Sequence, residues 1–187
     1  MAKSVKNISK TAQGASGRLN DFQRRPEAAL VQAYTGITQF RATGWAHPVN
    51  QCWALDYIHR GTQTQRIGSG RPFQRLSGIA ALYAPGKAYH EWREAGDSIE
   101  ESYVLITMEG DAERAFRMMT GRAGYCHFKD PDHVAGDMLR QIGQDLFTRS
   151  PGFLLHAHGL LFQLLAILLA SPVAGRQMRI ISKEPVK

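Results

Sequence analysis

The uncharged stretch near the C-terminus limits what this chain can fold into more than any other feature. Residues 150–175 contain no Asp, Glu, Lys or Arg, and Pro151 and Pro172 bracket a 20-residue core, GFLLHAHGLLFQLLAILLAS. An apolar run of that length would just cross a bilayer. His156, His158 and a glutamine would be costly at membrane depth, whereas a buried helix of a soluble bundle or dimer avoids that cost. The pattern therefore favours a buried helix, with a membrane-anchored module as the alternative.

Residues 36–108 have the pattern of an antiparallel β unit. Short apolar and aromatic runs alternate with glycine-containing turns, and the runs are Ile37–Phe40, Cys52–Ile58, Ile79–Tyr83 and Tyr103–Met108. Short strands with regularly spaced turn signals are typical of an antiparallel sandwich or barrel.

Residues 110–171 have the pattern of helices instead. A short helix is expected over 111–119, ended by Gly121, and a second helix is expected to begin near Asp132, just after Pro131. An apolar stripe along the second helix comprises Val134, Met138, Ile142 and Leu146. The uncharged run predicts a third helix over 153–170. Strands followed by helices indicate an α+β fold, with a β unit and a helical appendage.

The net charge and the cysteine spacing indicate the kind of partner and the cellular compartment. The 187 residues carry a formal net charge of +7, which favours anionic partners. Cys52 and Cys126 form no CxxC or zinc-ligand pattern, which suits a reducing cytoplasm. Residues 1–25 are basic and lack an apolar h-region, so they predict a mobile arm and no secretory signal. Such an arm could bind nucleic acid through its phosphates without sequence preference.

The run from Trp53 to Ile106 resembles the N-terminal sensor domain of AraC-type transcription regulators. An aromatic-led strand, WALDYI, is followed by spaced glycines and then by LYAPGKAYH, a hydrophobic strand that enters a Pro-containing turn and a His. The later run YVLI resembles the next strand, and PGFLLHAH resembles the opening of the family's second long dimerisation helix. The similarity spans roughly residues 30–170.

The resemblance implies a cupin-like antiparallel β-barrel that holds a small-molecule effector, followed by α-helices that pair two subunits. We therefore expect a mobile arm over 1–25, an effector-binding barrel over 26–128, dimerisation helices over 129–175 and a tail over 176–187. Members of the family continue into a DNA-reading domain of two helix-turn-helix units, which residues 1–187 lack. DNA binding would depend on that domain, and the protein is expected in the cytoplasm without membrane contact.

The sequence predicts no catalytic activity, metal or cofactor. A catalytic cupin usually holds a metal through His-x-His, but His90 is followed by Glu91 and Trp92. His156 and His158 lie on a predicted helix, where positions i and i+2 point about 200° apart and cannot share one ion. The chain contains no P-loop or Rossmann glycine pattern. A small cupin enzyme is the alternative class.

The segment from Arg66 to Gly78, RIGSGRPFQRLSG, holds three arginines and no acid. Arginine's planar fork suits phosphates and guanine edges, and an extended backbone would place Arg71, Phe73 and Arg75 on one face. The Arg71-x-x-x-Arg75 spacing is similar to the Arg-x-x-x-Arg element of PilZ domains, which bind cyclic di-GMP, although the second PilZ element, Asp/Asn-x-Ser-x-x-Gly, is absent.

We therefore expect Arg71 and Arg75 to clamp an anionic effector, with cyclic di-GMP as the specific candidate and Arg66 as a supplementary charge. The alternatives are a solvated hairpin, arginines that contact a partner subunit or the DNA-reading domain, and a sugar or another neutral effector.

The aromatic residues after Pro85 complete the candidate site. Tyr89 and Trp92 are expected near the mouth of the barrel, either as a stacking surface for the effector or as rim packing, while Trp45 and Trp53 are expected in the core. The two long helices carry more apolar surface than one small barrel can cover, which predicts a two-fold homodimer. The alternative is that one monomer covers both helices itself.

Overall fold

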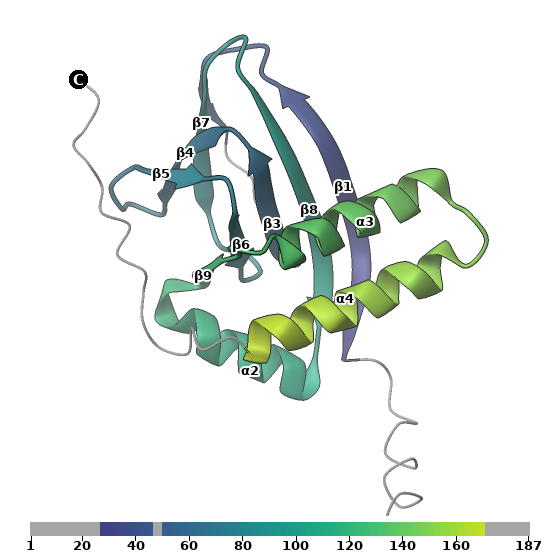
Figure 1. The fold of residues 1–187 in the computed structure, drawn as a ribbon. Helices are drawn as coiled ribbons and strands as arrows, with labels where there is room; N and C mark the ends of the chain where they lie inside the picture. Colours follow the sequence, from purple (N-terminus) through teal and green to yellow (C-terminus); the bar gives the residue numbers. More distant parts are fainter. Residues whose placement is uncertain (1–26, 47–49, 171–187) are drawn as a thin grey trace, which may run out of the picture.

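The computed structural model describes residues 27–46 and 50–170, and the predicted N-terminal arm and C-terminal tail lie outside these residues. Figure 1 shows antiparallel strands with helices laid across them. The strands are β1 (Ala28–Gln39), β2 (Gly44–Ala46), β3 (Trp53–Arg60), β4 (Thr62–Ile67), β5 (Phe73–Leu76), β6 (Ile79–Tyr83), β7 (Tyr89–Arg93), β8 (Ser98–Met108) and β9 (Tyr125–Lys129). The helices are α2 (Gly110–Thr120), α3 (Val134–Thr148) and α4 (Phe153–Ala170), and a 3-10 turn covers Gly121–Ala123.

The strands form two sheets. The large sheet has the order β1-β8-β3-β6-β9 and the small sheet has the order β2-β7-β4-β5, with antiparallel pairing throughout both. The predicted α+β class is confirmed. Among the described strands no hydrogen-bonded pair joins the two sheets, so the predicted closed barrel is not confirmed and the β unit is a two-sheet sandwich.

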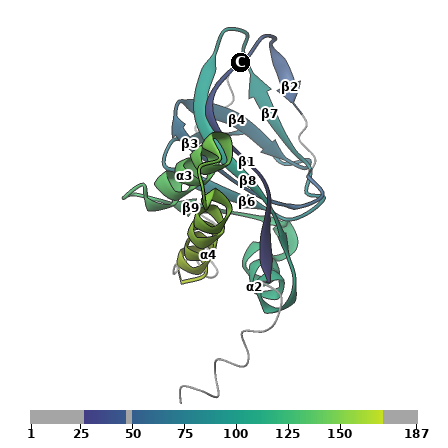
Figure 2. The same cartoon turned by 90° about the vertical axis from the view of Figure 1, so that its right-hand side faces the viewer.

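The main apolar core lies between the large sheet and the helices. Trp53, Leu55 and Tyr57 of β3 belong to this core together with residues of α2, α3 and α4. Because side chains alternate along a strand, the intervening Asp56 faces the other way, toward the small sheet. Figure 2 shows the resulting layers, with α3 and α4 on one side of the large sheet and the small sheet on the other.

Helix α3 approaches the large sheet through two glycines. A Cβ at Gly136 would lie 2.5 Å from Cε1 of Tyr57, and a Cβ at Gly143 would lie 2.8 Å from Cβ of Thr35. This close approach sets the buried face of α3, which consists of Ala135, Gly136, Leu139, Ile142, Gly143 and Asp145. The predicted stripe is therefore wrong at Val134, which is 43% exposed.

Strand β9 departs from the expectation that the chain is helical from residue 110 onward. Gly124 adopts a left-handed backbone with φ of 69°, and the chain then returns as β9 to pair with β6 at the edge of the large sheet. The sequence YCHFK places Cys126 and Phe128 against the main core, so its period-2 pattern was the available signal.

Helix α4 has the predicted bounds but is only partly covered. By length and composition it is long and apolar enough to cross a membrane, with a mean hydropathy of 2.0, and 28% of it is buried within the protein. Core helices of soluble proteins pass the same test. The described part of the chain leaves apolar side chains of α3 and α4 exposed, namely Val134, Phe147, Leu154, Leu155, Phe162, Ile167 and Leu169. The described residues of one protomer therefore leave part of both helices uncovered.

Candidate functional site

The face of the large sheet that is turned toward the small sheet, here called the inner face, carries polar side chains in rows set by strand register. The first row crosses β1, β8, β3, β6 and β9 through Tyr34, Tyr103, Asp56, Ala81 and His127. The neighbouring row crosses the same strands through Gln32, Leu105, Ala54, Tyr83 and Tyr125. The space between the two sheets is therefore lined by tyrosines, a carboxylate and an imidazole as well as by apolar groups.

Asp56 pairs with Arg75, which reaches it from the small sheet. Arg75 lies on β5 and is 1% exposed, and its guanidinium forms an ion pair with the Asp56 carboxylate. Its Nη2 also donates a hydrogen bond to the carbonyl oxygen of Ile79, at 3.4 Å. A charge buried without a partner would cost several kcal/mol, so this guanidinium is committed to joining the two sheets.

Strand β4 adds two buried amides beside a tyrosine pair. Gln63 and Gln65 are 3% and 0% exposed, and the Tyr83 hydroxyl donates to Oε1 of Gln65 at 2.9 Å. The Tyr83 ring stacks on the ring of Tyr89, with centroids 4.2 Å apart. Asn50 Nδ2 donates to the Tyr89 hydroxyl at 3.3 Å. Tyr89 is thus held on both its ring and its hydroxyl.

Two more carboxylates face the same space. Glu91 accepts a hydrogen bond from Arg93 at 2.9 Å, and Glu101 accepts one from the Thr38 hydroxyl at 2.6 Å. Burial, together with the charge of Asp56, raises the pKa of Glu91 to about 7. Burial also raises the pKa of Glu101 and of Asp56, although Arg75 opposes that rise at Asp56. The raised pKa values show that negative charge is unfavourable between the sheets, so an additional anion there would be unfavourable as well.

Several buried side-chain nitrogens have no hydrogen-bond partner among the described residues. They are Nε2 of Gln63, Nε2 of Gln65, Nε of Arg75 and Nε2 of His127. Burial and the nearby Arg75 lower the pKa of His127 to about 3, so this imidazole is neutral at physiological pH. Buried polar groups usually find partners, and water or a ligand can supply the partners of these nitrogens.

The inner face is closed at one part and half-open at another. Around Arg75 and Gln65 it is sealed, whereas Tyr34, Tyr103 and Leu105 are half-buried. The rings of Tyr34 and Tyr103 stack with centroids 5.5 Å apart, and Gln32 Nε2 donates to the Tyr103 hydroxyl at 2.9 Å. The partly exposed portion of the inner face is therefore its tyrosine-bearing part on β1 and β8.

The structure separates the five predicted site residues: four lie on the two sides of the small sheet and one lies in a turn. Arg75 and Tyr89 point inward, Arg66 and Trp92 lie on the outer side, and Arg71 is exposed in the turn between β4 and β5. The expectation that Arg71 and Arg75 share a face is wrong, because β5 begins only at Phe73 and its alternation does not extend to Arg71. The predicted two-arginine clamp is not formed.

The outer side of the small sheet brings two predicted residues together with Trp45. The guanidinium carbon of Arg66 lies 4.7 Å from the centroid of the Trp45 ring, and the Trp45 and Trp92 rings meet edge to face at 5.5 Å. The prediction that Trp45 is a core residue is therefore wrong. The same prediction for Trp53 is confirmed, since that residue is 1% exposed.

Most of the inner-face residues were not singled out by the sequence patterns. The signal for Gln63 and Gln65 was the strict alternation in TQTQRI, and the signal for Asp56 was its place as the lone acid in WALDYI. Glu91 and Glu101 lie in an acid-rich stretch that reads equally well as solvated surface. Only the pairing of the strands shows which acids point between the sheets.

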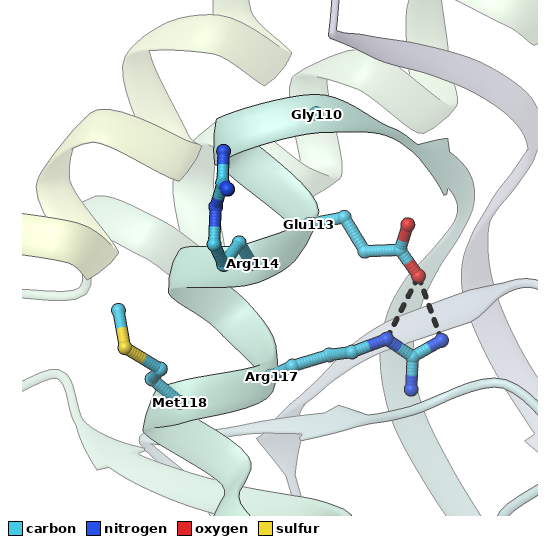
Figure 3. A pocket seen from close by; sticks show the side chains of 5 residues that line it. All are labelled: Gly110, Glu113, Arg114, Arg117 and Met118. Atoms are coloured by element: carbon cyan, nitrogen blue, oxygen red, sulfur yellow. Dashed lines mark hydrogen bonds and ion pairs between the residues drawn. The ribbon is translucent and has the colours of Figure 1, made fainter.

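A separate shallow pocket of about 520 Å³ lies on α2, lined by Gly110, Glu113, Arg114, Arg117 and Met118 (Figure 3). Arg117 Nη2 pairs with Glu113 at 2.6 Å, and Arg114 pairs with Asp111. Both guanidiniums are therefore already neutralised by carboxylates of their own helix, and the pocket offers weaker binding chemistry than the inner face.

The two histidines of α4 likewise already have hydrogen-bond partners within the protein. His156 Nδ1 lies 2.7 Å from Oδ2 of Asp145, and His158 Nδ1 donates to the carbonyl oxygen of Leu154 at 2.8 Å. Within residues 27–46 and 50–170 no group of three or more His, Cys, Asp or Glu side chains is placed to hold a metal ion.

The fold and the inner face define an α+β protein in which two antiparallel sheets enclose polar side chains. No protein-family model and no curated protein matches the sequence. Solved structures similar to this chain include ToxT from Vibrio cholerae O395, at 12% identity over 75% of this chain and 56% of that chain with a TM-score of 0.45.

Two further similar structures are ToxT of Vibrio cholerae strain SCE256 with an unsaturated fatty acid bound and YhaK from Escherichia coli. The first has 11% identity, covers 81% of this chain and 62% of that chain, and has a TM-score of 0.45. The second has 15% identity, covers 59% and 47%, and has a TM-score of 0.42. The chain thus spans about half the length of these proteins. At such identities and TM-scores the likenesses assign neither a family nor a ligand to this chain.

Proposed function

We propose that this chain is the effector-sensing and dimerisation domain of an AraC-like transcription regulator, and that it binds a small molecule at the inner face without transforming it. The observation that carries the proposal is the polar lining between the sheets. Facing sheets normally bury apolar side chains, and burying polar groups costs free energy. A chain that retains Asp56, Glu91 and Glu101 there has a use for them other than stability.

The chemistry of the inner face favours a neutral, hydroxyl-bearing effector. Unpartnered amide donors on Gln63 and Gln65 and an unpartnered imidazole nitrogen of His127 lie on the same lining as the carboxylates. A hydroxyl group both donates and accepts hydrogen bonds, so a ligand with several hydroxyls matches both kinds of group. The half-buried Tyr34 and Tyr103 rings offer an apolar surface for the carbon skeleton of such a ligand.

The expected cyclic di-GMP effector gains no support from this geometry. Arg75 is neutralised by Asp56, and Arg71 is exposed outside the sandwich. A phosphate between the sheets would face the carboxyl groups of Asp56, Glu91 and Glu101, with Arg75 and Arg93 as the opposing charges. The alternative of a sugar or another neutral molecule is therefore the better proposal.

The test is calorimetric titration of the full chain with a panel of neutral sugars and polyols, and with cyclic di-GMP beside them. We expect a neutral ligand to bind, and Glu101→Gln and Tyr103→Ala each to weaken binding by about tenfold, which is the loss of one good hydrogen bond or apolar contact. Arg71→Ala is the matched control at an exposed site, and it should leave the affinity unchanged.

The opposite pattern would overturn the proposal. Binding of cyclic di-GMP that is lost in Arg71→Ala, with no neutral ligand detected, would restore the anionic effector. Binding of a neutral ligand that is indifferent to both Glu101→Gln and Tyr103→Ala would move the site away from the inner face.

We also propose that α4 pairs with α4 of a second copy. Its exposed apolar side chains Leu155, Phe162 and Leu169 recur every seven residues, and Gly159 and Ala166 fall between them on the same stripe. A seven-residue apolar repeat with small residues is typical of a helix-to-helix contact. A two-fold dimer would cover this stripe with the same stripe of the partner.

Light scattering coupled to size-exclusion chromatography tests the pairing. We expect the wild-type chain to be a dimer and Phe162→Glu to be a folded monomer. Gln163→Glu adds the same charge at the next position of α4, off the stripe, and should stay dimeric. A monomeric wild type would contradict the dimer, and partition of the wild type into a detergent phase would support the membrane-anchored alternative. The proposal places the protein in the cytoplasm, where free thiols such as Cys52 and Cys126 stay reduced.

A further inference from the structure

The outer side of the small sheet is unusual for a solvated sheet face. Such faces are normally polar, but this one carries two tryptophans. The strand register places Trp45, Trp92, Thr64 and Gln74 in one row across β2, β7, β4 and β5. Arg66 lies opposite His90 in the next row. We call these six residues the outer platform.

No helix in the described part of the chain contributes to this platform. The main core that holds α2, α3 and α4 contains no residue of β2, β4, β5 or β7. Figure 2 shows β2 and β7 on the side of the molecule away from α3 and α4. Trp45 and Trp92 are each half-buried, so both rings keep part of their surface toward solvent.

The rings are fixed in place by their neighbours. Trp45 and Trp92 meet at an interplanar angle of 66° with centroids 5.5 Å apart. The Trp92 Nε1 donates to Glu94 at 2.7 Å, and Glu94 also accepts from the Thr43 hydroxyl at 3.2 Å. Glu94 is thus engaged at the edge of the indole, and the ring faces present no carboxylate.

The charge beside the rings is positive. Arg66 lies over the Trp45 ring at 4.7 Å, and its Nε has no hydrogen-bond partner among the described residues. The exposed turn that follows β4 carries Arg71. Residues 57–90 contain no Asp or Glu. The one carboxylate bonded to these rings, Glu94, is engaged at the edge of the Trp92 indole by Trp92 and Thr43. Stacking rings beside guanidinium groups suit a ligand with alternating flat bases and phosphates.

We propose that the outer platform binds single-stranded nucleic acid, with bases stacked on Trp45 and Trp92 and phosphates held by Arg66 and Arg71. Only a single strand exposes its base faces to such rings, because the bases of a duplex are stacked on one another. The row from Trp45 to Gln74 crosses four strands about 4.8 Å apart, or roughly 14 Å, which is room for two to three nucleotides. This inference is independent of the effector proposed for the inner face.

The experiment measures fluorescence anisotropy of labelled oligothymidine and oligouridine strands with the full chain, and intrinsic tryptophan quenching in parallel. We expect binding that weakens as salt rises. Trp92→Leu should weaken it about tenfold, within the range for base stacking on an aromatic ring, and Trp92→Phe should retain most of the affinity. Arg66→Gln should reduce the slope of log K against log salt by about one.

Two controls separate the platform from other sources of binding. Arg60→Gln removes an exposed arginine that pairs with Glu100 on the large sheet, and it should leave binding near the wild-type value. A triple variant of the N-terminal arm, Lys3→Ala, Lys6→Ala and Lys10→Ala, should retain the tryptophan quenching. Thermal melts check that each variant stays folded.

Three results would overturn the proposal. The first is the absence of binding at low salt. The second is binding that survives both Trp92→Leu and Arg66→Gln but is lost in the arm variant, which would assign it to the arm. The third is a duplex, or cyclic di-GMP alone, that binds at this face as tightly as the single strand does.

Discussion

Asp56 of β3 and Arg75 of β5 form an ion pair that spans the sandwich from the large sheet to the small sheet. Their side chains are 15% and 1% exposed, so the pair lies almost entirely out of water. A buried pair of this kind contributes little net stability compared with apolar residues, but breaking it leaves one uncompensated charge.

The first prediction follows from that asymmetry. Arg75→Met should lower the free energy of unfolding by about 3–5 kcal/mol, because Asp56 would remain buried without its partner. The double variant Asp56→Leu with Arg75→Met should recover most of that loss. Urea unfolding followed by circular dichroism measures both. A single variant as stable as the wild type would show that the pair is not formed in solution.

The second prediction concerns the approach of α3 to the large sheet. Gly136→Ala should destabilise the protein by about 1–3 kcal/mol, the usual cost of overpacking, because its Cβ would lie 2.5 Å from the Tyr57 ring. Gln144→Ala is the control at an exposed position of the same helix, and it should leave stability within about 0.5 kcal/mol of the wild type. Equal effects in the two variants would contradict the close packing of α3.

The third prediction is a pH dependence that originates at Glu91. Because its pKa is raised from an ordinary 4.5 to about 7, the folded carboxyl keeps a proton that the unfolded chain has already lost between these values. The contribution of this group to stability therefore falls as pH rises through that window. Glu91→Gln removes this dependence, so the variant should gain stability relative to the wild type between about pH 5 and pH 8, by about 3 kcal/mol at roughly 1.4 kcal/mol per pKa unit.

The control for Glu91 is Thr62→Ala, a change at an exposed, uncharged position of the small sheet, and the difference from wild type should stay constant over the same pH range. The lowered pKa of His127 acts in the opposite direction, but it is present in both proteins and cancels in the comparison. A flat difference for Glu91→Gln would mean that Glu91 is solvated in solution.

The fourth prediction distinguishes the two thiols. Burial raises the pKa of Cys126 to about 12, and only the thiolate is a good nucleophile. At mildly alkaline pH a thiol reagent should therefore label Cys52 in the folded protein and reach Cys126 only as the chain unfolds. Mass spectrometry of the labelled peptides, with Cys126→Ser as a reference, reports the order. Fast labelling of Cys126 in the native protein would contradict the burial of β9 against the core.

The long elements were predictable from the sequence because their patterns need no partner to be recognised. The charge-free run ended by prolines specifies α4, and Gly121 ends α2 through its left-handed φ of 54°. Strand β9 was not predicted. Its five residues directly follow a helical stretch, and an alternating pattern of only five residues is too short to indicate a strand there. The buried face of α3 was predicted wrongly at Val134. Two glycines, Gly136 and Gly143, form the contact with the large sheet, and a search for apolar side chains does not detect glycines.

The site was harder to predict, because it depends on which side of a strand each residue occupies. Arg71 and Arg75 share a face only if the strand runs through both, and the turn at residues 68–72 prevents that. The carboxylates of Glu91 and Glu101 look like solvated surface until the pairing of β7 and β8 is known. The local sequence shows that side chains alternate along a strand. Which of the two alternating sets is buried depends on where the opposing sheet lies.

Strand β7 has a mechanical consequence for the whole small sheet. Its consecutive residues alternate between the two sides, with Tyr89 and Glu91 inward and Trp92 outward. Glu91 and Trp92 are consecutive residues, so a single peptide unit joins the inner face to the Trp45–Trp92 pair. The small sheet is a single layer of strands, and the same backbone therefore carries both the inward carboxyl group of Glu91 and the outer platform.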